Sequence, residues 1–396
     1  MSSAKAIKKR SIHVIGCGQN INSCLGSRKI LDSGFYDICL PKTVKGVKKL
    51  VTGNSYSAFI DQCGRLFHWG QLTPKMNIIE DPTICSFFAN NKIKIIDIAC
   101  MNDHAAVITD SNQIYIWGHN FKNYFPNCNQ EYVDPSNPLL VDFPVLNSNP
   151  ISIVCGGFFV MTLFDNGNVY AFGYNDENAL GVYDPDDVIS TPTIMELSDI
   201  IQISAGWSHG CAVNKNHILY SWGRPSFGRL GHIHGCVISD VDIGLTNKSI
   251  SNTKDNDEFL VKMACCSHTS TFAVTVHDEI FSCGWNQCGE NAVGHKKSTR
   301  FMRRVIYDPL NNDSPHETPT KNRKVKNGIA NICGGAGSFI MLDENEIAYS
   351  SGSNKYNLIG LGKGCTESST LAQIGSLGHV KCMTTGCTHS LFAVEY

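Results

Sequence analysis

The sequence predicts an all-β fold, a seven-bladed β-propeller with four-stranded antiparallel blades. Within the 396 residues one unit recurs, in which small residues precede an apolar strand, a polar turn and a second apolar strand that ends at a glycine. Six copies are whole, and a seventh is divided between the two ends of the chain. A single small sheet cannot bury both of its faces, so the repeated sheets must pack radially against one another.

The six whole copies align on their last glycine. Each has two apolar stretches around a turn rich in Asp, Asn and Gly, such as Asp165-Asn166-Gly167-Asn168, which is the pattern of a β-hairpin. Each copy therefore predicts the hairpin of one blade. The terminal glycines are Gly70, Gly118, Gly173, Gly223, Gly284 and Gly352.

The seventh copy is split between the chain ends. "TTGCTHSLFAVEY" at the C-terminus supplies its first half, and "RSIHVIGCGQN" supplies an apolar strand that ends at Gly16. We expect these strands to pair in one sheet, which closes the ring and removes its open edges. Residues 11–396 are then one propeller domain with long loops at 119–150, 224–258 and 285–327, after a basic tail, residues 1–10, that we expect to be disordered.

Composition narrows the class of protein. The chain is 42% hydrophobic and 17% charged, with a net charge of -2 and no apolar run long enough to span a membrane. Its start has no secretory signal pattern, and its 18 cysteines include no Cys-x-x-Cys pair. We therefore expect an intracellular protein, nuclear or cytoplasmic, with reduced thiols, no metal, no cofactor and no membrane association.

Two stretches carry a resemblance to a known family. Ala205–Gly231 contains "AGWSHGCAV", "LYSWG" and "FGRLG", and Val169–Gly181 reads "VYAFGYNDENALG". Over about residues 11–396 the chain resembles the family of the regulator of chromosome condensation. The founding member exchanges guanine nucleotide on the small GTPase Ran and sits on chromatin, whereas many relatives are binding platforms without that activity.

The resemblance implies two functions from different classes. The first is a non-enzymatic, monomeric protein-interaction platform with a regulatory role, and the alternative is a guanine-nucleotide exchange factor for a Ran-like GTPase, which needs no covalent chemistry. The acidic residue expected in the first unit is absent from Gly16-Cys17-Gly18-Gln19. Asn102 stands where the third unit is expected to have Asp, with Asp103 and His104 beside it, and His268 lies two residues from the expected histidine. These departures favour the platform.

Candidate partner contacts come from the loops, where propellers display function. Trp207 is the first, because its repeat equivalents are Asn54, Asn102, Gly157, His268, Ala336 and Cys387, so the fold does not require an aromatic there. It is either an interface anchor or a local packing choice. By contrast, His104, His209 and His389 recur at one repeat position, where family resemblance implies a structural role. A segment matching the family's protruding wedge, residues 118–138, offers Phe121, Tyr124 and Phe125.

Two charged loops complete the set. The loop 176–187 includes Asp176 and Glu177, whose charges favour a basic partner. A solvated loop that binds no partner would have the same acidic composition. The loop 295–326 is basic and, with the basic tail, favours contact with chromatin, nucleic acid or an acidic protein surface. A flexible, solvated insertion that binds no partner would have the same basic composition. Its cations are Lys296, Lys297, Arg300, Arg303, Arg304, Lys321, Arg323, Lys324 and Lys326. No motif of a covalent enzyme appears.

Overall fold

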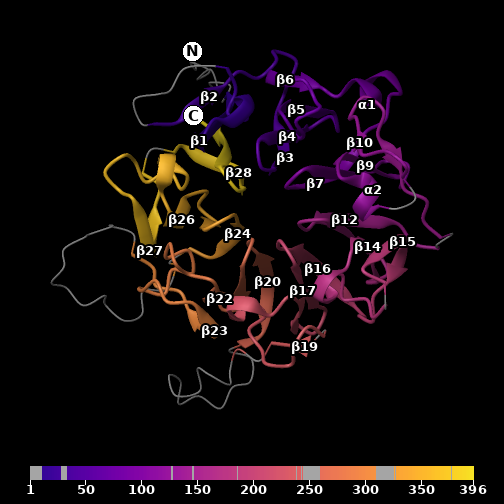
Figure 1. Ribbon diagram of the computed structural model, residues 1–396. Helices are drawn as coiled ribbons and strands as arrows, with labels where there is room; N and C mark the ends of the chain where they lie inside the picture. Colours follow the sequence, from indigo (N-terminus) through magenta and orange to yellow (C-terminus); the bar gives the residue numbers. More distant parts are fainter. Residues whose placement is uncertain are drawn as a thin grey trace, which may run out of the picture.

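Seven blades surround a central channel in the computed structural model (Figure 1). The structure describes residues 11–27, 34–125, 128–144, 147–184, 186–237, 239–241, 243, 259–308, 325, 327–375 and 377–396. The predicted tail, residues 1–10, and much of the basic loop, including Lys321, Arg323, Lys324 and Lys326, lie outside the described residues.

In each blade, sheet order runs from a first strand at the channel to a fourth strand at the rim, and neighbouring strands are antiparallel. Blade 1 comprises β3 (Val47–Thr52), β4 (Tyr56–Asp61), β5 (Leu66–Gly70) and β6 (Ile79–Ile84), and blade 2 comprises β7 (Ile95–Met101), β8 (His104–Thr109), β9 (Ile114–His119) and the short rim strands β10 (Tyr132–Val133) and β11 (Leu139–Leu140). Blade 3 comprises β12 (Pro150–Cys155), β13 (Phe159–Phe164), β14 (Val169–Tyr174) and β15 (Val188–Ile194), and blade 4 comprises β16 (Ile200–Ala205), β17 (His209–Asn214), β18 (Leu219–Gly223) and β19 (Ser239–Asp240). Blade 5 comprises β20 (Val261–Cys266), β21 (Ser270–Thr275), β22 (Ile280–Gly284) and β23 (Thr299–Arg304), and blade 6 comprises β24 (Ile329–Gly334), β25 (Ser338–Asp343), β26 (Ala348–Ser353) and β27 (Glu367–Gln373).

The seventh blade joins the two ends of the chain. Its order is β28 (His379–Thr385), β29 (His389–Glu395), β1 (Ile12–Gly18) and β2 (Tyr36–Ile38), and β1 and β28 both lie near the C mark in Figure 1. This confirms the predicted seven-bladed propeller and its closure by terminal strands.

One detail of that closure is corrected. The strand does not end at Gly16 but continues to Gly18, which pairs with His389 as Gly223 pairs with His209. Gly18 has φ of +117°, and a Cβ on it would lie 2.4 Å from the carbonyl oxygen of Thr388, so this position needs glycine. A shift of two residues keeps every side chain on the same face of the strand, which is why the apolar pattern alone did not reveal it.

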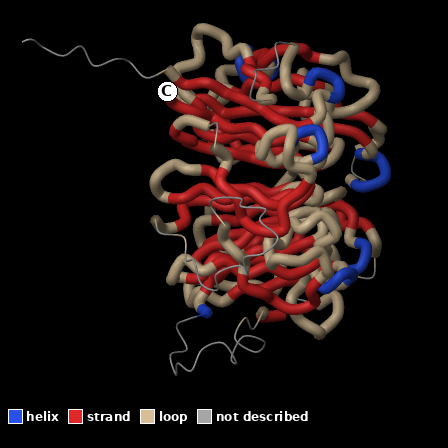
Figure 2. Tube along the Cα trace, turned by 90° about the vertical axis from the view of Figure 1, so that its left-hand side faces the viewer, coloured by secondary structure: helices blue, strands red, loops and turns tan. Residues whose placement is uncertain are grey.

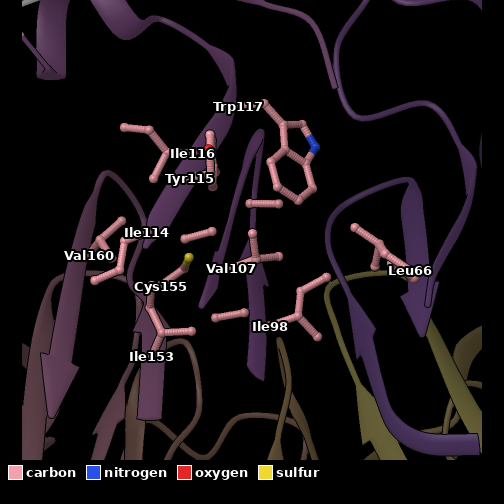
Figure 3. Close-up of a cluster of buried hydrophobic side chains, with 14 of the residues drawn as sticks. Leu66, Ile98, Val107, Ile114, Tyr115, Ile116, Trp117, Ile153, Cys155 and Val160 are labelled. Carbon is pink, nitrogen blue, oxygen red and sulfur yellow. The ribbon is translucent and has the colours of Figure 1, made fainter. Parts of the chain in front are cut away.

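The core lies between the blades. All six residues of the second strand are buried in each of blades 1 to 6, because neighbouring blades cover both faces of the sheet. Figure 3 shows one such layer, in which Ile98 and Val107 of blade 2 pack near Leu66 of blade 1 and Ile153 of blade 3. The apolar runs in the sequence are therefore strands buried on both faces.

Rim strands occupy parts of the segments that the sequence predicts as long loops. β10 and β11 lie within 119–150, β19 within 224–258, and β23 within 285–327. A rim strand pairs along one edge only and is partly solvent-exposed, so it carries no continuous apolar run. In β23, for example, Met302 is the one fully buried residue.

Antiparallel order gives the ring two faces with different loops. Face 1 carries the loops after the first and third strands of each blade, and face 2 carries the loops after the second strand and the links between blades. Short helical segments in the loops after third strands lie on face 1, whereas α1 (Ser86–Asn90) lies in the link between blades 1 and 2. Figure 2 shows most helical segments along the edge opposite the C-terminus. Those on face 1 are η1 (Ile21–Ser23), α2 (Phe121–Tyr124), η2 (Asp176–Asn178), η3 (Ser226–Gly228) and η5 (Lys355–Asn357).

Candidate partner-binding surface

On face 1, the loops between first and second strands form a ring around the mouth of the channel. The loop of one blade donates a backbone N–H to a carbonyl in the loop of the next. The N–H of Gly157 donates to Trp207 (2.9 Å), and that of Trp207 donates to His268 (3.2 Å). Asn54 donates to Asn102 and Ala336 to Gly386 in the same way. Trp207 and its predicted repeat equivalents therefore sit side by side around the mouth.

The recurring histidines connect neighbouring blades. Nε2 of His104 lies 3.3 Å from the carbonyl oxygen of Phe159 in the next blade, while Nε2 of His389 lies 2.7 Å from Oγ of Ser57 in blade 1. His209 reaches Thr271 of blade 5 in the same manner, at 3.2 Å. Burial lowers the pKa of His104 to about 4 and that of His389 to about 3, so both imidazoles are neutral near pH 7. Their contacts are structural, as the family resemblance implies, and each joins one blade to the next.

Five aromatic side chains lie in contact across face 1, and we call them the aromatic row: Tyr174, Tyr124, Phe158, Trp207 and His268. Tyr124 stacks on Phe158 with ring centroids 4.3 Å apart, and Tyr174 lies 5.3 Å from Tyr124. Trp207 meets Phe158 edge to face at 5.5 Å and lies 5.1 Å from His268. All five are half-buried. The row therefore joins the loops of blades 2 to 5 in one partly exposed band.

Sequence reasoning missed two members of the row. Phe158 occupies a loop position that holds Ser55, Asp103, Ser208, Thr269, Gly337 and Thr388 in the other blades, so an aromatic at this one turn was a visible signal. Tyr174 had no such signal, because it follows Gly173 at a position whose residue varies freely between copies.

The surroundings of the row are acidic at one end. The N–H of Asn175 donates to the carbonyl of Asp187 (2.7 Å), which places this aspartate beside Tyr174. Burial and then the charges of Asp176 and Asp187 raise the pKa of the Tyr174 hydroxyl. Asp103, in the loop of blade 2, is half-buried, and burial raises the pKa of its carboxyl while His119 lowers it.

A buried arginine stands at the other end. Arg229 is 3% exposed, its Nη1 donates to Oγ of Ser208 (3.2 Å), and its Nε donates to the carbonyl of Ser226 (3.0 Å). Burial lowers the pKa of Arg229 to about 10, so it remains a cation at pH 7. This charge lies next to the loop that carries Trp207.

The channel behind the mouth has a volume of about 400 Å³ and is lined by first strands. Where it opens on face 1, Sγ of Cys387 lies 3.2 Å from Nε2 of His268. Burial raises the pKa of Cys387 to about 12 and lowers that of His268 to about 4. Both groups are neutral near pH 7, so this pair is not an activated thiolate of the kind that attacks a substrate.

Other predicted residues are placed differently. Phe121 is fully buried and Phe125 nearly so, in the core between blades 2 and 3, so Tyr124 alone of the three reaches the surface. Asn102 is buried with φ of +52°, and His104 is buried against Phe159. Of the exchange candidates, Asp103 and His268 remain accessible at the mouth.

The charged candidates do not form one surface. Asp176 and Glu177 lie on face 1 in η2, where Glu177 pairs with Arg224 at 3.1 Å. Lys296 pairs with Glu367, and Arg304 pairs with Glu279 at 2.5 Å. Besides Lys296, three further cations are exposed on or before β23: Lys297, Arg300 and Arg303.

Face 1 also holds an unusual carboxyl between blades 5 and 6. Glu290 is 1% exposed; its Oε2 accepts the N–H of Cys288 (3.1 Å), and its Oε1 has no hydrogen-bond partner among the described residues. Burial raises the pKa of Glu290 from 4.5 to about 7. Across the described part of the chain, no group of three or more His, Cys, Asp or Glu side chains is arranged to hold a metal ion.

Known proteins that contain the same kind of repeat are similar to this chain. Two models of the regulator of chromosome condensation (RCC1) repeat match residues 166–213 and 200–229. The E3 ubiquitin-protein ligase HERC2 of Mus musculus is 27% identical over 289 residues, which cover 61% of this chain and 6% of HERC2. The ultraviolet-B receptor UVR8 of Arabidopsis thaliana is 23% identical over 281 residues, which cover 67% of this chain and 60% of UVR8. The chain thus spans a small part of HERC2 and less than two thirds of UVR8.

A solved structure shows the same fold. Prp20p from Saccharomyces cerevisiae superposes with a TM-score of 0.76 and 16% sequence identity, covering 98% of this chain and 93% of that one. Its published description concerns binding of Prp20p to Gsp1p and histones. In the described residues, no helix is long and apolar enough to cross a membrane.

Proposed function

The chain belongs to the RCC1 repeat family, and from that premise we propose that it is a regulatory protein-interaction platform, which binds a partner protein through face 1. The protein relatives HERC2 and UVR8 are a ubiquitin ligase and a light receptor by name, so this repeat serves proteins of different activities. Binding is the function that a rigid ring with varied loops supports without covalent chemistry.

The aromatic row is the observation that carries this proposal. Trp207 lies within the row, in contact with Phe158 on one side and His268 on the other. Large aromatic side chains that are fixed in place and partly exposed are favoured anchors of protein interfaces, because they lose little conformational freedom on binding. A row that joins four blades offers a continuous contact surface rather than one isolated ring.

Cross-linking with a matched control tests the platform. Purified wild-type protein and two variants, Trp207→Ala and Tyr356→Ala, serve as baits in extract, and covalently captured proteins are compared quantitatively. Tyr356 is 57% exposed on face 1 in blade 6, away from the row. We expect specific partners that Trp207→Ala loses and Tyr356→Ala retains. Capture that is equal for all three baits would remove Trp207 as an anchor.

A second candidate function is nucleotide exchange on a Ran-like GTPase. Asp103 favours it, since a half-buried carboxyl stands at the mouth beside the position where exchange factors of this family are expected to have one. The assay is release of mant-GDP from a panel of small GTPases by purified protein. Acceleration on a Ran-like member that disappears in Asp103→Ala would place exchange above the platform. No acceleration would end this candidate.

Chromatin or nucleic acid is a further candidate partner, supported by the exposed Lys297, Arg300 and Arg303. Because β23 (Thr299–Arg304) is the rim strand of blade 5, deleting the whole basic loop would damage the fold. Charge reversal of these three residues is the safer perturbation. We expect DNA binding that falls steeply with salt and weakens in the triple Glu variant; binding that is unchanged in that variant would exclude this surface.

A further inference from the structure

We propose that the aromatic row, together with Asp176 and Asp187, binds the cationic side chain of a Lys- or Arg-containing segment of the partner. This inference rests on the proposed function, because it assigns the chemistry of the partner at the same face. It commits to a cationic protein segment as the occupant.

The aromatic rings of the row can attract a cation. Aromatic faces carry negative electrostatic potential and attract ammonium and guanidinium groups within about 6 Å of the ring centroid. The ring centroid of Tyr124 lies 4.3 Å from that of Phe158 and 5.3 Å from that of Tyr174, and all three side chains are half-buried. A side chain laid on the row therefore meets more than one ring. An alkyl stem of Lys or Arg can pack on the same rings while its charged end stays near the carboxylates.

Carboxylates near the row can also attract a cation. The loop after β14 carries Asp176, Glu177, Asp184, Asp186 and Asp187, and Asp103 stands at the mouth. In the described part of the face-1 loops of blades 2 to 4, the arginines that oppose them are already engaged. Arg224 pairs with Glu177, and Arg229 is buried against Ser208 and Ser226. Of the other carboxylates in this loop, Asp176 is half-buried and Asp187 is exposed, so a partner can reach both.

The position of Arg229 indicates which end of the aromatic row the cation occupies. Its charge repels a second cation from the end of the row near Trp207 and His268, and His268 itself is neutral near pH 7 because its pKa is lowered to about 4 by burial. The cationic group therefore binds at the other end of the row, over Tyr124 and Phe158 toward Tyr174. Trp207 then contacts the apolar part of the same segment, and the cation lies nearer to Asp176 and Asp187.

The direct test uses three fluorescein-labelled peptides that differ in one chemical property. They are Gly alternating with Arg, with citrulline (the neutral analogue of Arg), or with Glu. Binding is measured by fluorescence anisotropy at pH 7.5 and 0.15 M salt. We expect the Arg peptide to bind at least about fivefold more tightly than the citrulline peptide and the Glu peptide to bind least. Equal binding of the Arg and citrulline peptides, or none by either, would overturn the inference.

Variants locate the site. Phe158→Leu keeps an apolar side chain but removes the ring, and Tyr356→Leu makes a matched change on face 1 outside the row. We expect the first to weaken the Arg peptide by roughly two- to thirtyfold, the range for loss of a cation–π contact, and the second to leave it unchanged. Urea unfolding midpoints of the two variants show whether either has lost its fold. Equal weakening in both folded variants would contradict the placement.

The two proposals can fail separately. Asp176→Asn/Asp187→Asn is added to the cross-linking experiment with Trp207→Ala. Partners lost in Trp207→Ala but retained in the double Asn variant would support the platform and overturn the cationic partner. Partners lost in both, but not in Tyr356→Ala, support both proposals. Capture that no variant changes removes both.

Discussion

The buried carboxyl of Glu290 makes stability depend on pH in a way that one substitution should abolish. Glu290→Gln keeps the shape of the side chain, and its amide oxygen can still accept the N–H of Cys288. The amide cannot ionise. Comparison of wild type with this variant therefore isolates the cost of charging one carboxyl in the space between blades 5 and 6.

The magnitude follows from the pKa. An acid whose pKa is about 7 in the folded protein and 4.5 otherwise binds more protons folded than unfolded between those values, so the free energy of unfolding falls as pH rises through this window. At about 1.36 kcal/mol per pH unit, the loss reaches roughly 3 kcal/mol above pH 7. Below pH 4.5 the carboxyl is protonated in both states, and the variant should lie close to wild type.

The assay is equilibrium urea unfolding at pH 4.5, 6, 7 and 8, followed by fluorescence of the five tryptophans. Other titrating groups are common to both proteins and cancel in the difference. We expect the variant to gain roughly 3 kcal/mol relative to wild type between pH 4.5 and 8. The exposed Glu196→Gln serves as the control and should show no such trend. A difference between Glu290→Gln and wild type that is constant with pH would refute this reasoning.

Three further predictions concern the scaffold. Gly210→Ala would place a Cβ 2.5 Å from the buried ring of Trp222, so we expect destabilisation of about 1–3 kcal/mol in urea unfolding. Asp97 accepts the backbone N–H of Ile153 in the next blade and pairs with Lys49. Asp97→Ala removes this acceptor and should lower the free energy of unfolding by about 1–3 kcal/mol, whereas Asp97→Asn should lower it less. Of the 18 cysteines, Cys39 and Cys63 are the exposed ones, so a thiol reagent should label these two first under native conditions, as peptide mass mapping would show.

Much of the fold could be predicted because the hairpins repeat. Glycines such as Gly70 and Gly223 adopt positive φ and would meet backbone atoms of the preceding loop if they carried a Cβ, so the requirement for glycine recurs once per blade. The positions of the rim strands could not be predicted, since these strands pair on one side only and are half-exposed, and some are very short. For β19, pairing extends over only Ser239 and Asp240.

The candidate site was predictable in part. Trp207 departs from its repeat equivalents, and the structure places it in the aromatic row between Phe158 and His268. Phe121 and Phe125 resemble surface aromatics in a polar segment, yet they turn inward because the short helix α2 (Phe121–Tyr124) packs on the core of blade 2. Which side of a short loop helix faces inward depends on tertiary packing, and no local pattern reveals it.

Closure of the ring through blade 7 has a consequence for biosynthesis. β1 pairs with β29 over seven residues, so its inner edge stays open until the ribosome has released His389 to Glu395. At about 5–20 residues per second, the stretch from Gly18 to His389 takes roughly 20–75 s to translate. During that time the nascent chain carries an unsatisfied apolar strand that invites chaperone binding or misassociation. β29 thus decides whether β1 is sheltered, and a message truncated before residue 389 should yield a product that is degraded.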